Sequence, residues 1–307
     1  MAGAAAMFGT NSYISRGASD VGLSALPLVS WRGAIGTVAM LVLTQFLTVR
    51  GAHRGAAPPT WLPVGSGRRL LVACLLGAVV NVCMFEAFLR TTIATALICF
   101  YTFPALVTLA AVPFYGERLN AVRGGALLIS AIGLVVVVLS PVLGSGALSL
   151  DPVGIGLALV AAVCQASFLL IAGRGFGPLP PVRVAAYSIF ATGAVAWLLT
   201  LGTGDFAGLW LPLGEPAAWV WILLGGIIGA AIPTTMFLTG IGLIGPSRAA
   251  ILMTIEPLVG VTLAALLLGE RPLPIQVVGG VAVLAAAIIL QVVPSKVPPE
   301  PEFGALV

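Results

Sequence analysis

Long apolar stretches follow one another along almost the whole chain, separated by short segments rich in proline, glycine and polar residues. Each stretch is about 20 residues long, which is the length that an α-helix needs to cross the hydrocarbon core of a bilayer. The alternation of apolar and polar residues that is typical of strands is absent. The pattern therefore predicts an all-α integral membrane protein with ten transmembrane helices, at residues 4–19, 26–49, 70–88, 92–115, 121–139, 153–172, 184–201, 219–238, 247–268 and 275–293.

The two ends of the chain differ from the rest. The first helix begins almost at Met1 and is short, which leaves two interpretations open: a sequence that starts late, or a helix that is genuinely short. The first residues have neither the basic segment nor the small-residue cleavage site of a secretory signal peptide. Residues 294–307 are rich in proline and glutamate, and we expect a disordered cytoplasmic tail there.

One pattern occurs twice in the chain. Residues 103–118 form an apolar helix that carries a proline and ends in Gly-Glu-Arg, and residues 256–271 do the same at an offset of 153 positions. A repeat at about half the length of a very apolar chain is typical of a duplicated membrane transporter. The repeat predicts two five-helix units, residues 1–140 and residues 151–293.

Composition agrees with a membrane protein. The chain is 60% hydrophobic and 8% charged, and its mean hydropathy is +1.15, whereas soluble domains carry roughly 25% charged residues. The net charge of +4 is too small to indicate nucleic-acid binding. The four cysteines lie within apolar stretches, and their spacing indicates no disulfide and no metal site. We expect no metal and no cofactor, and we expect the lipid bilayer as a partner.

Basic residues predict the orientation, because cytoplasmic loops carry an excess of lysine and arginine. With the N-terminus inside and ten alternating helices, nine basic residues lie inside and three outside, while Arg16 and Arg248 lie within helices. Those inside are Arg50, Arg54, Arg68, Arg69, Arg118, Arg123, Arg174, Arg183 and Lys296, and those outside are Arg32, Arg90 and Arg271. We therefore expect a multi-pass protein of the inner (plasma) membrane with both termini in the cytoplasm.

Five helices in each unit is an odd number, so the second unit inserts upside down relative to the first. Glu117-Arg118 then faces the cytoplasm, and Glu270-Arg271 faces the outside. The sequence thus predicts two inverted five-helix repeats, with a substrate site near the midplane between them.

The repeated segments resemble the EamA family of the drug/metabolite transporter superfamily. The resemblance covers about residues 4 to 293 and rests mainly on the proline-to-Gly-Glu-Arg signature, present in both halves. Gly9-Thr10-Asn11 and Trp31-Arg32 also resemble the first and second helices of that family, although the first helix here is shorter. The resemblance implies a ten-helix carrier with a central cavity that moves small metabolites, driven by a proton or an exchange gradient.

Two glutamates lie inside predicted helices, where a charge is costly and marks a functional candidate. Glu86 is interpreted either as a substrate or proton site, or as the ion-pair partner of Arg90 four residues later. Glu256 either takes up a proton or pairs with a cationic group of the substrate. Its structural interpretation is that it satisfies backbone groups freed by Pro257 or pairs with Arg248.

Neutral polar residues inside the helices supply the other candidates, because each must face protein or water. Each of them has an alternative role in a helix-to-helix hydrogen bond. The cavity that the resemblance implies draws on these helices. The predicted substrate-binding residues are Asn11, Tyr13, Asn81, Glu86, Tyr101, Gln165, Thr234 and Glu256.

Three prolines are predicted hinges, because proline removes a helix hydrogen bond and permits bending. These are Pro104, Pro233 and Pro257, and a fixed packing shape is the alternative. Arg16 is interpreted as an interfacial arginine rather than a substrate clamp. Glu117-Arg118 and Glu270-Arg271 are interpreted as local ion pairs at helix ends, with gating as the alternative.

Other classes of membrane protein fit less well. An intramembrane aspartyl protease needs two aspartates at membrane depth, and a zinc protease needs HExxH, but the single histidine, His53, lies in a loop. A channel would need rings of charge or a carbonyl filter. We therefore predict a secondary carrier, not an enzyme, that exports amino acids or related compounds by alternating access as a monomer or homodimer. Uptake or exchange of a sugar, nucleobase or vitamin is the alternative, and a non-transport membrane protein is the remote one.

Overall fold

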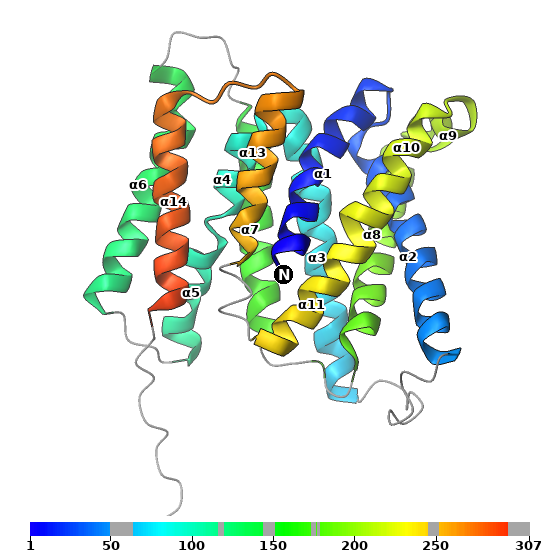
Figure 1. Cartoon of the computed structure of the whole chain (residues 1–307), viewed down its shortest axis with the longest axis horizontal. Coiled ribbons are helices and arrows are strands. Elements are labelled where there is room, and N and C mark those ends of the chain that lie inside the picture. The colour runs from blue at the N-terminus through cyan, green and yellow to red at the C-terminus, as the bar shows by residue number, and fades with distance from the viewer. Residues whose placement is uncertain are drawn as a thin grey trace, which may run out of the picture.

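Every regular element that the structure describes is a helix (Figure 1). The structure is a computed structural model, and it describes residues 1–49, 64–115, 120–143, 151–172, 176, 179–244 and 252–293. The first Gly-Glu-Arg segment, Arg248 and the predicted tail at 294–307 lie outside these ranges.

The first half of the chain contains helices that agree closely with the predicted apolar stretches. They are α1 (Ala2–Asp20), α2 (Ala25–Val49), α3 (Val64–Arg90), α4 (Ile93–Phe100), α5 (Phe103–Tyr115) and α6 (Ala121–Leu143).

The second half continues in the same manner, with one segment of wider helical turns. Its elements are α7 (Pro152–Ala172), α8 (Pro181–Thr203), α9 (Phe206–Gly214), α10 (Ala217–Leu223), the π-helix η1 (Leu224–Ala231), α11 (Ile232–Ile244), α13 (Ile255–Leu267) and α14 (Pro274–Val292).

Eight helical segments among the described residues are long and apolar enough to cross a membrane. They coincide with eight of the ten predicted spans. The other two positions are occupied by α1 and by the 13-residue α13, which are helical but are not among the eight. α1 is more polar than its neighbours because it lies inside the bundle, packed against α13, η1, α11 and α3.

The prediction of one continuous helix over 92–115 is wrong in detail. The helix stops at Phe100, and Tyr101 and Thr102 form a turn before α5 begins at Phe103. Pro104 is the second residue of α5, where its missing N–H has no helical partner to lose. The break therefore lies just before the proline instead of at it.

The two halves of the chain meet along α2 with α8 and along α6 with α14. Glycines permit a close approach in both pairs, because an added Cβ on Gly33 would overlap the Cα of Gly193, and one on Gly133 would lie 2.8 Å from the carbonyl oxygen of Gly279. Small residues at crossing points allow membrane helices to approach closely.

We predict that Gly33→Ala lowers the stability of the protein, because the added methyl meets the backbone of α8 and cannot be accommodated by moving a side chain. Overpacking of this kind costs about 1–3 kcal/mol. Gly156→Ala is the matched control, since nothing lies within 4 Å of an added Cβ there. Thermal unfolding of both purified variants tests the prediction, which fails if the two melt alike.

Candidate functional site

A cavity of about 170 Å³ lies between the two halves of the bundle, bordered by residues of α1, α2, α3, α4, α5, α7, α8, η1, α11 and α13. A water molecule needs about 10–15 Å³ of such space, so the cavity has room for roughly ten waters or for an organic molecule of similar size. We call it the central cavity.

Six of the eight predicted substrate-binding residues line the central cavity, although they come from six different helical segments or breaks. They are Asn11, Asn81, Tyr101, Gln165, Thr234 and Glu256.

The other two predicted residues, Tyr13 and Glu86, are not among the lining residues. The ring of Tyr13 packs edge-on against Trp221, with the ring centroids 5.4 Å apart. Glu86 accepts a hydrogen bond of 2.8 Å from Nε of Arg90. The contacts of Glu86 therefore favour its alternative interpretation as an ion-pair partner one helical turn away.

Tyr101 and Glu256 form a polar pair across the two halves of the chain. The hydroxyl of Tyr101 lies 2.5 Å from the carbonyl oxygen of Met253 and 3.0 Å from Oε2 of Glu256. A phenol has one hydrogen to donate, so it cannot serve both acceptors fully at once. The carbonyl oxygen of Met253 and Oε2 of Glu256 therefore compete for the one hydroxyl hydrogen of Tyr101.

Helix breaks put these groups at mid-depth in the bundle. Tyr101 stands in the turn between α4 and α5, and Met253 precedes the start of α13. Glu256 lies in the first turn of α13, where the positive end of the helix dipole favours a carboxylate. Two of the predicted hinges, Pro104 and Pro257, lie in the first turns that follow these breaks.

Pro233 has a similar place in the third interrupted helix. It is the second residue of α11, directly after the π-helix η1. Wider π-helical turns leave backbone carbonyls without regular helical partners and often occur at functional sites. The carbonyl oxygen of Gly229 in η1 indeed accepts side-chain hydrogen bonds from Asn11 at 3.1 Å and from Arg32 at 3.2 Å.

Arg32 is a cavity residue that sequence reasoning missed. It was expected outside, but it lies in the third turn of α2, is only 3% exposed and lines the central cavity. Its guanidinium carbon lies 4.2 Å from the ring centroid of Phe85, a cation–π contact. The signal was present in the sequence, because position 32 falls inside the predicted helix 26–49, at a depth where an arginine is costly.

The central cavity lies toward the end of the bundle where α7 joins α8. Its lining residues on α7, such as Gln165 and Phe168, lie near the end of that helix, and those on α8, such as Val184 and Ser188, lie near its start. We call this the α7–α8 end. The other end, where α13 stops, is the Glu270 end, at the top of Figure 1.

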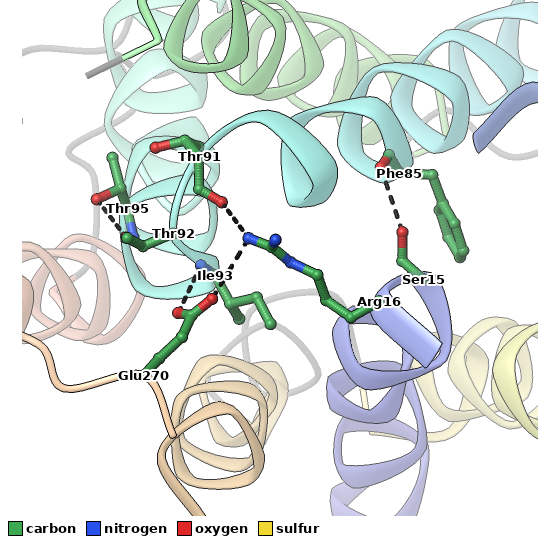
Figure 2. Close-up of polar contacts among 8 residues, drawn as sticks. All are labelled: Ser15, Arg16, Phe85, Thr91, Thr92, Ile93, Thr95 and Glu270. Atoms are coloured by element: carbon green, nitrogen blue, oxygen red, sulfur yellow. Dashed lines mark hydrogen bonds and ion pairs between the residues drawn. The ribbon is translucent and has the colours of Figure 1, made fainter. Parts of the chain in front are cut away.

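The Glu270 end is tied by a polar cluster (Figure 2). Oε2 of Glu270 accepts a hydrogen bond of 3.0 Å from the backbone N–H of Ile93, the first residue of α4. Arg16 on α1 lies 3.4 Å from Oε1 of Glu270 and donates at 2.8 Å to the carbonyl oxygen of Thr91. Three elements distant in sequence thus meet at one carboxylate.

The end of α13 sets the position of Glu270. Gly269 has a φ of +68°, and the N–H of Glu270 bonds back to the carbonyl oxygen of Ala264 in a Schellman-type turn. Burial raises the pKa of Glu270 above its ordinary value, whereas the Ile93 N–H and the charge of Arg16 lower it. The expectation of a local ion pair in Glu270-Arg271 is corrected, because the cation paired with Glu270 is Arg16.

A second ion pair stands at the same end. Arg90, which holds Glu86, also lies 3.6 Å from Asp151 at the start of α7. An added Cβ on Gly154 would lie 2.9 Å from Cβ of Arg90, so α7 and the end of α3 are in close contact here. The Glu270 end therefore joins α1, α3, α4, α7 and the end of α13, whereas the central cavity occupies the bundle below it.

The sequence matches a known family over most of its length. The model of the EamA-like transporter family matches residues 1–139 and 152–292. An uncharacterized transporter of Bacillus subtilis, YxxF, is 27% identical over 70% of this chain and 67% of its own length. A second transporter of that organism, YcbK, is 30% identical over 41% of each chain. An uncharacterized transporter of Archaeoglobus fulgidus is 26% identical over 74% of this chain and 77% of its own length.

The fold itself resembles a protein of known crystal structure. The two superpose with a TM-score of 0.59 at 19% sequence identity, covering 94% of this chain and 93% of the other. At this identity the likeness speaks for the fold alone. It extends over both halves of the bundle.

Proposed function

The chain belongs to the EamA-like transporter family, and on this premise we propose that it is a secondary carrier of small metabolites. Amino acids or related compounds are the first choice of substrate, and export is the proposed direction. The observation that carries the proposal is the central cavity, where polar groups from six helical segments converge between the two halves. Converging polar groups in one apolar cavity are typical of a small-molecule site.

The proposal includes two inverted five-helix repeats, residues 1–140 and 151–293. Helix packing supports it, because contacts occur in matching pairs when α1 to α6 are compared with α7 to α14. The contact of α1 with α13 corresponds to the contact of α7 with α4 and α5. The contact of α3 with α7 likewise corresponds to that of α11 with α1. A two-fold relation between the halves would produce this pairing, and a shared site is then expected at their interface.

We propose alternating access as the mechanism, with the cytoplasm at the α7–α8 end. The central cavity lies toward that end, while the Glu270 end is held together by ion pairs and hydrogen bonds. Arg183, near the start of α8, and the paired Arg68-Arg69, near the start of α3, belong to the α7–α8 end. Moving Arg32 from the outside to the cavity leaves two outer basic residues against nine inner ones, so the charge bias for this orientation becomes stronger.

Proton coupling is proposed from the Tyr101–Glu256 pair. The hydroxyl group of Tyr101 has one hydrogen but two acceptors within 3.0 Å. Protonation of Glu256 supplies a second hydrogen, so that both contacts can then be hydrogen bonds. Glu256 belongs to the second half and Tyr101 to the first. A proton on this carboxyl therefore changes a contact between the two halves as well as the charge of the cavity.

The alternative is uptake or exchange of a sugar, nucleobase or vitamin. Asn81, Gln165 and Thr234 in the cavity wall could bind the polar groups of any of these. Unlike the first choice, the alternative does not require a charged residue of the cavity to pair with the ligand.

Flux into proteoliposomes tests the proposed function. We expect purified protein to give saturable movement of at least one labelled metabolite from a panel of amino acids, sugars and nucleobases, because a carrier binds before it moves its substrate. Liposomes without protein are the control. Flux that rises linearly with concentration would indicate a channel, and no flux of any compound would contradict a transport role.

A further inference from the structure

We propose that Arg32 and Asn11 form the subsite that binds the carboxylate and the α-ammonium group of an amino-acid substrate. The inference rests on the proposed carrier function and names the chemistry by which the central cavity selects its substrate. It starts from two residues of the cavity wall, each of which has one fully buried polar atom without a hydrogen-bond partner: Nη1 of Arg32 and Oδ1 of Asn11.

The guanidinium of Arg32 is held in place but is not neutralised. Nη2 donates to the carbonyl oxygen of Gly229 at 3.2 Å, and the ring of Phe85 covers one face at 4.2 Å. Nη1 is buried and has no acceptor. Among the residues that the structure describes, no carboxylate lies within ion-pair distance of Arg32. A buried arginine that is held in place and has no anionic partner is expected to pair with an anionic group of a ligand.

Asn11 lies directly beside this group. Its Nδ2 donates at 3.1 Å to the same carbonyl oxygen of Gly229 that accepts from Arg32. The amide is thereby oriented, and its Oδ1 faces the close-packed backbone at Gly229, where an added Cβ would overlap it. Oδ1 has no donor and is buried. One carbonyl thus brings together an unused cationic donor and an unused neutral acceptor.

Leaving both atoms unpaired is costly. A buried donor or acceptor without a partner costs about 1–3 kcal/mol, and more when it is charged. Native proteins contain few such groups, and those that persist usually serve a function. Two of them on neighbouring residues that line one cavity are explained if both side chains turn toward the cavity when a ligand binds and the ligand satisfies both atoms.

The complementary ligand carries an anion next to an N–H donor. A carboxylate neutralises Arg32 and accepts from Nη1, while an ammonium group on the adjacent carbon donates to Oδ1 of Asn11. A sugar or a nucleobase would leave the charge of Arg32 uncompensated inside the membrane, where charges are costly. An inorganic anion would leave Oδ1 without a donor.

The remainder of the cavity favours an apolar side chain. Several phenylalanines line it, and these rings contact apolar groups well. They include Phe85, Phe88, Phe100, Phe103, Phe168 and Phe237. We therefore assign the site to α-amino acids with apolar side chains.

Ligand binding to the wild-type protein tests the subsite without any mutation. The probes are L-phenylalanine, L-phenylalaninamide, phenethylamine and 3-phenylpropanoic acid, measured by calorimetry with the full chain. We expect the amino acid to bind, and each of the others to bind roughly tenfold or more weakly, because each loses a hydrogen bond to or from a charged group. Binding of the amide or the amine as tightly as the amino acid would overturn the proposal.

Variants then assign the effect to the two residues. Arg32→Gln and Asn11→Ala should each weaken L-phenylalanine binding about tenfold or more, whereas the control Arg271→Gln, an exposed arginine at a helix end, should not. Arg32→Lys keeps a charge at the site and serves if the glutamine variant does not fold. Unchanged affinity in Asn11→Ala, or in a folded Arg32→Gln, would overturn the assignment.

The flux assay separates this inference from the proposed function. Saturable flux of L-phenylalanine that its amide does not inhibit supports both. Saturable flux of a sugar or nucleobase alone would overturn the subsite while the carrier function stands. Absence of flux for every compound would contradict the carrier function, and the subsite would fall with it.

Discussion

Glu256→Gln is expected to abolish proton-driven accumulation while leaving the protein folded. Glutamine keeps the shape of the side chain and can still bond to Tyr101, but it cannot release a proton. If one proton accompanies each substrate, a gradient of one pH unit drives about tenfold accumulation, since one unit corresponds to 1.36 kcal/mol. The variant should instead equilibrate its substrate to equal concentrations on both sides.

Accumulation in proteoliposomes under an imposed pH gradient measures this effect. Glu215→Gln is the matched control, because Glu215 is an exposed glutamate whose Oε1 accepts from the backbone N–H of Ala217 in its own turn. Tyr101→Phe should weaken coupling as well, since it removes the partner of the carboxyl. Gradient-driven accumulation that persists in Glu256→Gln would contradict proton handling at this residue.

Glu270→Ala is expected to open the Glu270 end of the bundle. The substitution leaves the N–H of Ile93 without its acceptor and Arg16 without its anion. The side chains of Arg16 and Glu270 are 31% and 18% exposed. The loss of stabilising free energy is therefore smaller than for a fully buried ion pair, at about 1–2 kcal/mol. A change of this size shifts the equilibrium between the closed and the open conformation about 5–30-fold.

Cysteine labelling from either side of the membrane detects this shift. Cys74 lines the central cavity and can serve as the reporter when Cys83, Cys99 and Cys164 are replaced. We expect an impermeant maleimide to label Cys74 from the α7–α8 side in the parent chain, and from both sides after Glu270→Ala. Arg271→Gln controls for charge at the same end. If the alanine variant is labelled from one side only, the cluster does not hold that end closed.

Local sequence features predicted the helices well. Apolar length alone located eight spans, because the cost of burying backbone polar groups in lipid leaves few alternatives to a helix. Interruptions were harder to predict. Pro104 marks a break that lies before it, at Tyr101 and Thr102, and the π-helix η1 has no proline within it.

Contacts between distant residues were beyond the sequence. Glu270 meets Arg16 across 254 positions, and nothing in either local segment indicates the other. Arg32 was misplaced because it was counted as a loop charge, although its helical position was predicted correctly. Tyr101 and Glu256 were both candidates by polarity alone, and only the fold shows that they bond to each other.

The crossing of α2 and α8 at Gly33 and Gly193 differs in kind from the contacts at the Glu270 end. Backbone touches backbone there, so the attraction is dispersion, which dissolved ions do not screen. The pairs of Arg16 with Glu270 and of Arg90 with Asp151 are partly exposed, and ionic strength weakens such pairs. In the proposed orientation, a rise in external salinity should therefore weaken the contacts at the Glu270 end and leave the α2–α8 crossing intact, so that osmotic conditions bias the protein toward one conformation without separating its halves.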